Sequence, residues 1–361
     1  MGKWVIAMAL TAILSGMWTA KDTSKEDKAA LVAKWEQYQT DFDAIKEMGD
    51  LEQFGYEPIE EQSFPVLLKS FGKEEVLFVP AIQKEYGRLG IFLMDQKGKV
   101  LFKTRSLSAN MVYTGQLDQP VKGISAVSFQ DVDKDGLEDI LLIINCENET
   151  GNYVGESYKI GDILYQGKKT FYRDYRISDK INRFDMNKSI KLMKAYAVDG
   201  ISTEFLYTSQ TLKELLEHGF EIIEEQCYYR YFEKLGRLRV VPGVFNVAEY
   251  HIFMIYLVNE EGDIVWNFQP MGDYDSLYSL KGITGRDLDA DGLKDLAVLA
   301  KYSYEGPKGE LLVDTVCAVY YQRTGGFETD TEFVEEYTCT EDETLEHVVK
   351  MVREFWGWSY E

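Results

Sequence analysis

Two short acidic loops carry the residue pattern with the clearest chemistry in this sequence. One runs from Asp131 to Asp139 and the other from Asp287 to Asp295, and each has aspartate at positions 1, 3, 5 and 9 and glycine at position 6. Hard oxygen ligands in this order suit calcium, and the glycine permits the positive φ that turns the loop back on itself. Carboxylates held together without a cation repel one another. The pattern therefore predicts a calcium site in each loop, with magnesium as the second choice.

The loops differ from an EF-hand, because position 12 holds Leu142 or Val298 where an EF-hand has a chelating glutamate. An apolar segment typical of a strand follows each loop. The alternative to a metal site is a polar β-turn with an Asx cap. The presence of all four carboxylates and the glycine in both loops favours calcium.

Paired glutamates are the one group of candidate catalytic residues that this acidic composition provides in abundance. Glu60-Glu61 and Glu224-Glu225 recur in two similar stretches, and a carboxylate pair is what a glycosidase uses. Adjacent residues on a strand point to opposite faces, so we expect these pairs to be a surface feature rather than a catalytic one. The sequence contains no G-x-S-x-G, phosphate-binding loop or dinucleotide fingerprint.

The cysteines and histidines are too sparse to define a site from the sequence. The cysteines are Cys146, Cys227, Cys317 and Cys339; they allow three complete pairings, and none lies in a C-x-x-C motif. The three histidines are scattered and adjoin no cysteine cluster, so zinc has little support.

The elements that must position the loops occur twice along the chain. The stretch "GYEPIEEQ" at residues 55–62 reappears as "GFEIIEEQ" at residues 219–226, with six of eight positions identical and an offset of 164 residues. Further matches follow in the same order, and the offset is 156 residues at the acidic loops. Collinear similarity of this kind predicts an internal duplication, with two halves that share one fold.

Each half has the pattern of short strands flanked by helices. Segments such as "EVLFVPAI", "LGIFLM" and "DILLII" are rich in β-branched and aromatic residues. Helical periodicity appears at residues 25–48, 178–197 and 340–356. We expect a mainly β fold with flanking helices (α+β), built from two duplicated β-meander units at residues 21–200 and 201–361. "DILLII" and "DLAVLA" follow the loops and are continuously apolar, so both faces of these strands should be buried.

The N-terminal end and the charge indicate where the protein acts. Residues 1–20 have a basic start at Lys3 and an apolar run from Trp4 to Trp18, which predicts a secretory signal peptide; a core helix or an uncleaved anchor are the alternatives. No cysteine precedes Cys146, so no lipid anchor on an N-terminal cysteine is expected. The formal charge of −22 repels nucleic acids and anionic lipid surfaces. We expect a secreted or cell-envelope protein with no nucleic-acid partner and no membrane span after signal removal.

The pattern D-x-D-x-D-G-x-x-D followed by an apolar strand resembles the FG-GAP or VCBS repeat, which occurs in extracellular proteins and in the propeller of integrin α subunits. The whole chain is also similar to exported proteins of gut Clostridia that carry this repeat. The resemblance implies propeller-blade-like units and a calcium ion in each loop. The ligands that it implies are Asp131, Asp133, Asp135, the carbonyl of Leu137 and Asp139, and then Asp287, Asp289, Asp291, the carbonyl of Leu293 and Asp295.

These features favour a non-catalytic, calcium-stabilised extracytoplasmic binding protein whose partner is a polysaccharide or a cell-surface protein. The aromatic clusters at residues 227–232 and 355–360 are candidate stacking platforms for sugars, and strand or helix packing is the alternative for both. A secreted glycoside hydrolase and a dockerin-like adaptor are the competing functions. Dockerin loops lie closer together, and each is followed by a helix.

Overall fold

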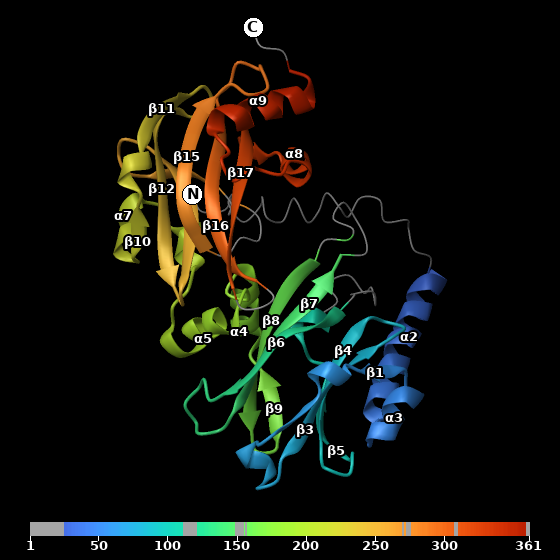
Figure 1. Ribbon diagram of the computed structural model, residues 1–361. Coiled ribbons are helices and arrows are strands. Elements are labelled where there is room, and N and C mark those ends of the chain that lie inside the picture. Colours follow the sequence, from blue (N-terminus) through green and yellow to red (C-terminus); the bar gives the residue numbers. More distant parts are fainter. Residues whose placement is uncertain are drawn as a thin grey trace. The chain divides into compact units, whose positions relative to one another are not determined.

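The chain folds into two compact units, residues 1–200 and 201–361. Figure 1 shows unit 1 in blue to green and unit 2 in yellow to red. The structure is a computed structural model, and it describes residues 25–110, 121–148, 155, 157–268, 271, 276–306 and 310–358. The fold is mainly β, with four antiparallel sheets. The signal peptide expected at residues 1–20 lies outside the described residues. Within those residues, no helix is long and apolar enough to cross a membrane.

Unit 1 contains two sheets that share one core. The first sheet has the order β1-β3-β4-β5 with β2 also paired to β3, and the second has the order β6-β7-β8-β9. Phe78 and Ile91 of the first sheet and Ile140 and Leu142 of the second belong to the same buried cluster. The strands are β1 (Tyr56–Pro58), β2 (Phe64–Val66), β3 (Val76–Gln83), β4 (Arg88–Met94), β5 (Val100–Thr104), β6 (Val121–Gln130), β7 (Asp139–Glu147), β8 (Ser157–Gly167) and β9 (Thr170–Arg173).

Helices cover the outer faces of both sheets in unit 1. Tyr38 and Phe42 of α2 pack on Tyr56 and Phe92 of the first sheet. Helices α4 and α5 contact β8 and β7 of the second sheet. Unit 1 is therefore a layered sandwich of helix, sheet, sheet and helix. Its helices are α2 (Lys25–Ala44), α3 (Met48–Gln53), α4 (Tyr175–Arg183) and α5 (Ile190–Asp199), with short 3₁₀ turns η2 (Glu60–Gln62), η3 (Lys69–Phe71) and η4 (Ser108–Asn110).

The two sheets of unit 2 have the same strand orders as the corresponding sheets of unit 1. The first is β10-β12-β13-β14 with β11 also paired to β12, and the second is β15-β16-β17-β18. The two sheets again share a buried cluster, which includes Val240 and Ile255 from the first and Leu296 and Val298 from the second. The strands are β10 (Phe220–Ile222), β11 (Tyr228–Phe232), β12 (Gly236–Val247), β13 (Tyr250–Val258), β14 (Ile264–Phe268), β15 (Ser276–Arg286), β16 (Asp295–Glu305), β17 (Leu311–Arg323) and β18 (Gly326–Thr329).

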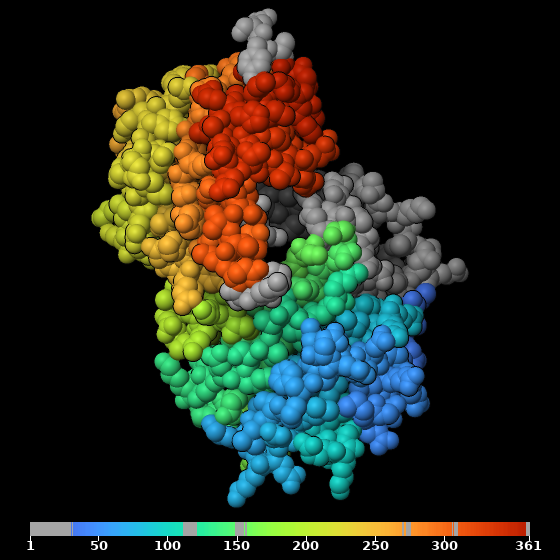
Figure 2. All heavy atoms as spheres, in the orientation of Figure 1, coloured from blue at the N-terminus to red at the C-terminus, as the bar shows by residue number. Residues whose placement is uncertain are grey.

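The outer faces of unit 2 are covered by short helices and by the C-terminal helix. Val348 and Val352 of α9 pack on Ala297 and Leu299 of β16. Figure 1 shows α9 across the strands of this sheet, and Figure 2 shows the red surface of the C-terminal segment over the orange strands. Helix formation at α9 follows from the N-cap, because the Thr344 side chain accepts a hydrogen bond from the N–H of His347. The helices are α6 (Glu204–Thr208), α7 (Leu212–Glu217), α8 (Thr331–Glu336) and α9 (Leu345–Trp356), with the 3₁₀ turn η5 (Glu224–Gln226).

The strands that follow the acidic loops are central and buried on both faces, as the sequence predicts. In β7, Ile140 and Leu142 face the other sheet, and Leu141 and Ile143 are buried on the opposite side. In β16 the same alternation divides the strand between the two clusters of unit 2. Each loop is therefore held at the start of a strand that cannot shift without moving the core.

Three sequence-based expectations about the elements are wrong in detail. Each unit has two sheets rather than one meander, because strands that are apolar on both faces need a second layer to cover them. The helix expected at residues 178–197 is two helices, since Asp185 has a φ of 56° and Ser189 caps a new start. The helix expected at residues 25–48 ends at Ala44, and Asp50 accepts the N–H groups of Lys46 and Glu47 to begin α3.

Candidate metal centres

The two acidic loops occupy the same place in their units, between the first and second strands of the second sheet. The first loop connects β6 to β7, and the second connects β15 to β16. The backbone turns in the same way in both loops. Positions 4 and 6 have positive φ, with 64° at Lys134 and 89° at Gly136, and 61° at Ala290 and 85° at Gly292. The glycine at position 6 relieves the strain that a side chain would meet there.

Three carboxylates converge in each loop. Oxygens of Asp131, Asp133 and Asp139 lie within 4.8 Å of one another, and the same holds for the second set, Asp287, Asp289 and Asp295. These are positions 1, 3 and 9 of the predicted ligands. Each group could hold a metal ion, because oxygens at such separations can reach one cation.

The aspartate at position 5 has a different role in the structure. Asp135 Oδ1 accepts the N–H of Leu137 at 2.8 Å, and Asp291 Oδ1 accepts the N–H of Leu293 at 2.8 Å. Each side chain therefore closes an Asx turn within its loop. Neither belongs to its group of three converging carboxylates. The predicted carbonyl ligands at Leu137 and Leu293 stay predictions.

The aspartate at position 9 is buried and hydrogen-bonds the loop to a neighbouring strand, in addition to being a candidate metal ligand. Asp139 accepts the N–H of Val132 at 2.9 Å and the N–H of Gln166 in β8 at 2.8 Å. Asp295 makes the equivalent pair of bonds, to the N–H groups of Leu288 at 2.6 Å and Gln322 at 2.8 Å. This carboxylate ties the start of the loop to the neighbouring strand. Each of its oxygens keeps a second lone pair for a cation.

Burial raises the pKa of several loop carboxyls. Burial is the main reason that the pKa values of Asp133, Asp139 and Asp291 lie above the usual range, and it raises the pKa of Asp295 to about 7. Neighbouring carboxylates add to the effect in each case. In addition, Asp287 Oδ1 is buried and has no hydrogen-bond partner in the described part of the structure. A bound cation would favour the charged carboxylates and satisfy this oxygen, so the donor set fits a hard divalent ion.

A positively charged side chain lies against the second loop. Arg323 Nη1 donates to Asp289 Oδ2 at 2.9 Å and lies 3.6 Å from Asp291 Oδ2. Residue 167, at the offset of 156 that relates the loops, is Gly167 at the end of β8. The guanidinium of Arg323 in β17 therefore lies beside the second loop, whereas the matching residue of unit 1, Gly167, has no side chain. No local sequence pattern indicates this contact, because Arg323 is 34 residues from Asp289.

Each loop is joined to the rest of its unit by an ion pair at position 8, and the two pairs have opposite polarity. In unit 1, Lys69 of η3 lies 2.9 Å from Glu138. In unit 2, Glu233 pairs with Lys294. Glu233 also accepts the backbone N–H of Lys294 at 2.8 Å. Comparison of charges at matching offsets could have found these pairs, since residues 69 and 233 differ by 164 and residues 138 and 294 by 156.

The two expected aromatic clusters have different environments. On β11, Tyr229 and Tyr231 are 53% and 59% exposed and lie on one face of the strand, because alternate residues share a face. The guanidinium of Arg237 lies 4.6 Å from the centre of the Tyr229 ring. In the C-terminal cluster, Trp356 donates to Asp330 at 2.8 Å and Trp358 packs edge-on against Tyr321. The first cluster is therefore divided between an exposed face with Tyr229 and Tyr231 and a core face with Phe232, and the second cluster, of which residues 355–358 are described, is mainly helix packing.

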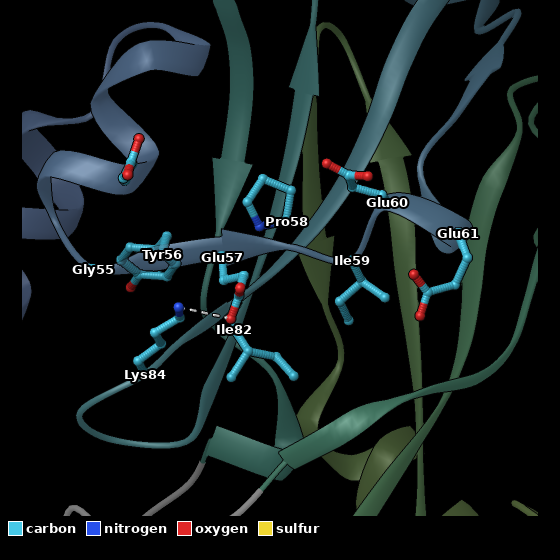
Figure 3. A pocket seen from close by; sticks show the side chains of 10 residues that line it. Gly55, Tyr56, Glu57, Pro58, Ile59, Glu60, Glu61, Ile82 and Lys84 are labelled. Carbon is cyan, nitrogen blue, oxygen red and sulfur yellow. Dashed lines mark ion pairs between the residues drawn. The ribbon is translucent and has the colours of Figure 1, made fainter.

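The paired glutamates lie on 3₁₀ turns rather than on strands, so the expected separation onto opposite faces of a strand does not apply. Glu60 and Glu61 line a surface cavity of about 680 Å³ together with Glu57 and Lys84, which form an ion pair at 3.0 Å. Figure 3 shows the carboxylates of Glu60 and Glu61 directed away from each other. In unit 2, Glu224 pairs with a cationic partner, Arg239. The geometry shows no carboxylate pair arranged around a common point at these residues.

Comparison with known proteins gives no family assignment. No protein-family model matches the chain, and no curated protein matches it. Among solved structures, the exo-inulinase from Aspergillus awamori is similar at a TM-score of 0.23 and 14% identity, over 74% of this chain and 48% of the inulinase chain. The chain thus spans about half the length of that enzyme.

Proposed function

We propose that the protein is a calcium-stabilised, non-catalytic binding protein that acts outside the cytoplasm. The observation that carries the proposal is the convergence of three carboxylates in each unit, at equivalent places before a buried strand. All six ligands are oxygens, which suits calcium better than zinc or copper. Within the part of the chain that the structure describes, both converging groups consist of aspartates alone, with no histidine or cysteine. Calcium in this setting holds the loops rather than performing chemistry.

Calcium would act on stability through the start of the central strands. The loops lead directly into β7 and β16, and Asp139 and Asp295 link them to the adjacent strands. Neutralising the clustered carboxylates removes a repulsion that the metal-free fold must bear. A ligand that binds the folded state and not the unfolded one stabilises the fold by RT ln(1 + L/Kd), where L is the free ligand concentration, so the melting temperature rises with the logarithm of ligand concentration above Kd. We favour this proposal over a dockerin-like adaptor, whose loops lead into helices, because strands follow both loops here.

The test is calcium titration of chelator-treated protein by calorimetry, together with melting curves in calcium and in chelator. Wild type is expected to bind two calcium ions per chain and to melt at a higher temperature when they are bound. The double variant Asp131→Ala plus Asp133→Ala should bind one. The matched control, Glu74→Ala plus Glu75→Ala, removes two exposed carboxylates of unit 1 outside the loop and should still bind two. Identical melting curves in calcium and chelator, with no binding heat, would reject the calcium sites.

The face formed by Tyr229 and Tyr231 supports binding of a polysaccharide. Two exposed rings on one strand face, with Arg237 beside them, offer apolar surface for sugar rings and donors for hydroxyl groups. Affinity electrophoresis in gels containing soluble polysaccharides tests this part of the proposal. Tyr229→Ala plus Tyr231→Ala should abolish any retardation, and Tyr278→Ala, which removes an exposed tyrosine from β15, should keep it. Retardation that is unchanged by the double variant would assign binding to another surface.

Glycoside hydrolysis is the second candidate function, and the cavity beside β1 is the observation in its favour. Glu57, Glu60 and Glu61 line it, and most glycosidases use two carboxylates, so this activity requires that two of these side chains, which diverge in Figure 3, turn toward one bound sugar. Release of reducing sugar from the polysaccharide that is retarded in the gels would support this function. Loss of that release in Glu60→Gln or Glu61→Gln would locate it in the cavity.

A further inference from the structure

Two of the four cysteines lie side by side in unit 2. Cys317 in β17 belongs to a buried apolar cluster against which Cys339, in the connection between α8 and α9, is packed, and the two thiols lie close enough to interact. Both side chains belong to the apolar layer between β17 and the C-terminal helices. Cys317 is 5% exposed, whereas Cys339 is partly accessible to solvent. Contact between the two thiols distinguishes this pair from an isolated buried cysteine.

The other cysteines have different partners. Cys146 lies in unit 1 and hydrogen-bonds to Tyr158, and Cys227 donates to the carbonyl of Ile223 at 3.6 Å. At the offset of 156 residues, the position of Cys317 corresponds to Gly161, where a Cβ atom would meet Asn187 and Ile181 at 2.9 Å. The thiol pair is therefore specific to unit 2.

We propose that Cys317 and Cys339 form a reversible disulfide, with low-molecular-weight disulfides such as glutathione disulfide as the oxidant. The bond would close the segment from 317 to 339, which contains α8, and would fix the chain before α9 to β17. The pair is a modification site that is separate from the aspartate loops. It does not depend on calcium binding.

The two thiols have different roles in the exchange. The hydrogen bond from Cys317 lowers the pKa of the Cys339 thiol, and Lys281 nearby acts in the same direction. The hydrogen bond to Cys339 and burial raise the pKa of Cys317. The thiolate, not the thiol, attacks a disulfide, so the more exposed Cys339 is the first nucleophile.

The reaction is a double exchange that balances in atoms and electrons. Cys339 thiolate attacks one sulfur of glutathione disulfide, which forms a mixed disulfide on Cys339 and releases one glutathione thiolate. Cys317 then loses its proton to solvent, and its sulfur attacks Cys339 Sγ, which releases the second glutathione. The disulfide of the oxidant is reduced to two thiols, and the two protein thiols are oxidised to one disulfide. A dithiol reductant reverses both steps.

The experiment treats the reduced full chain with glutathione disulfide, quenches it by alkylation and maps the peptides by mass spectrometry. We expect the peptides containing Cys317 and Cys339 to be linked, while Cys146 and Cys227 are alkylated. The oxidised protein should melt at a higher temperature than the reduced protein, and Cys339→Ser should abolish this difference. Retention of four alkylated thiols, or linkage through Cys146 or Cys227, would overturn the proposal.

Two variants test the assigned order of attack. Cys317→Ala should accumulate a glutathione adduct on Cys339, because the first step proceeds and the second cannot. Cys339→Ser should leave Cys317 unmodified, because this thiol is buried. Cys227→Ser is the matched control in the same unit and should form the disulfide as wild type does. A glutathione adduct on Cys317 in the Cys339→Ser variant would contradict the proposed order of attack. The disulfide itself is tested separately, by the peptide map of the wild-type protein.

Discussion

At the level of single residues, the two candidate metal loops differ in the charge that faces them. Arg323 donates to Asp289 in the second loop, and the matching position in unit 1 is Gly167. The guanidinium neutralises part of the carboxylate charge and would also repel an incoming divalent ion. The two loops should therefore differ in calcium affinity, with the first loop tighter. Glycine in unit 1 and arginine in unit 2 would thus give different calcium affinities to two loops with the same backbone conformation.

The variant Arg323→Gly should bind calcium more tightly at the second loop. Unit charges 4 Å apart in water interact by about 1 kcal/mol, and a divalent ion doubles this to about 2 kcal/mol, so removing the guanidinium should raise the calcium affinity by about thirtyfold. Calorimetry in an Asp131→Ala plus Asp133→Ala background reports the second loop alone. Arg323→Lys keeps the charge and should change affinity much less. Equal affinity in all three proteins would show that Arg323 does not control the site.

Glu343 makes a pH-dependent contribution to the stability of unit 2. Burial acts to raise its pKa, but hydrogen bonds from Tyr337 and His347 and from the backbone of Thr340 and Thr344 outweigh burial and hold the pKa at about 2. A carboxyl with a lowered folded-state pKa stabilises the protein above its unfolded value of 4.5, and this stabilisation is lost as pH falls from about 4.5 to about 2.

The variant Glu343→Gln should be less stable than wild type at pH 7, by on the order of 2 to 3 kcal/mol. The difference should shrink below pH 4.5, because wild type then loses the same charged interactions. Urea unfolding at a series of pH values measures both. A matched control is Glu335→Gln on the exposed side of α8, which should differ little from wild type at any pH. A deficit that is independent of pH would instead indicate a packing role for Glu343.

At the level of elements, ion pairs join each acidic loop to the chain next to the first sheet. The side chains of Lys69 and Glu138 are 65% and 22% exposed, whereas those of Glu233 and Lys294 are 26% and 30% exposed. Burial acts to raise the pKa of Glu233, but hydrogen bonds from the Lys294 side chain and from the backbone of Glu233 and Lys294, together with the charge of Lys294, outweigh it and lower the pKa to about 2. The pair in unit 2 is therefore the stronger attachment, since water screens it less.

Double-mutant cycles in chelator measure these attachments. Alanine variants of Lys69 and Glu138, singly and together, should give a coupling energy below about 1 kcal/mol, as exposed pairs do. The same cycle on Glu233 and Lys294 should give about 1 to 3 kcal/mol, because a charged hydrogen bond is stronger when partly buried. Equal coupling in the two cycles would contradict the difference in burial as its cause.

Sequence patterns located the elements better than the contacts among them. The strands after the loops were predictable, because "DILLII" and "DLAVLA" are continuously apolar, and the convergence of Asp131 and Asp133 followed from their spacing around a glycine. The break of the helix at Asp185 was not predictable, since the helical periodicity continues across it. The contact of Arg323 with Asp289 and that of Cys317 with Cys339 depend on strand pairing across the sheet and helix packing, which no local window contains.

At the level of the whole molecule, each unit has its own buried clusters, with one core between its sheets and another under its helices. Residues 201–361 produced as a separate chain should therefore fold, melt cooperatively and bind one calcium ion. Circular dichroism and calorimetry measure this. Leu257→Ala in that fragment, at a side chain with 0% exposure, should cost about 2 to 5 kcal/mol and serves as the check that a packed core is being measured. A fragment that lacks a cooperative transition would show that unit 2 depends on the rest of the chain.

The opposite polarity of the two position-8 ion pairs has a consequence for how a chain with two similar halves avoids misfolding. Similar segments in one polypeptide can exchange during folding, so that a loop from one half docks on the other. Such an exchange would bring Lys69 against Lys294 and Glu138 against Glu233, and like charges in contact disfavour it. The reversed polarity thus favours correct pairing during folding, because each loop can form its ion pair only with its own half of the chain.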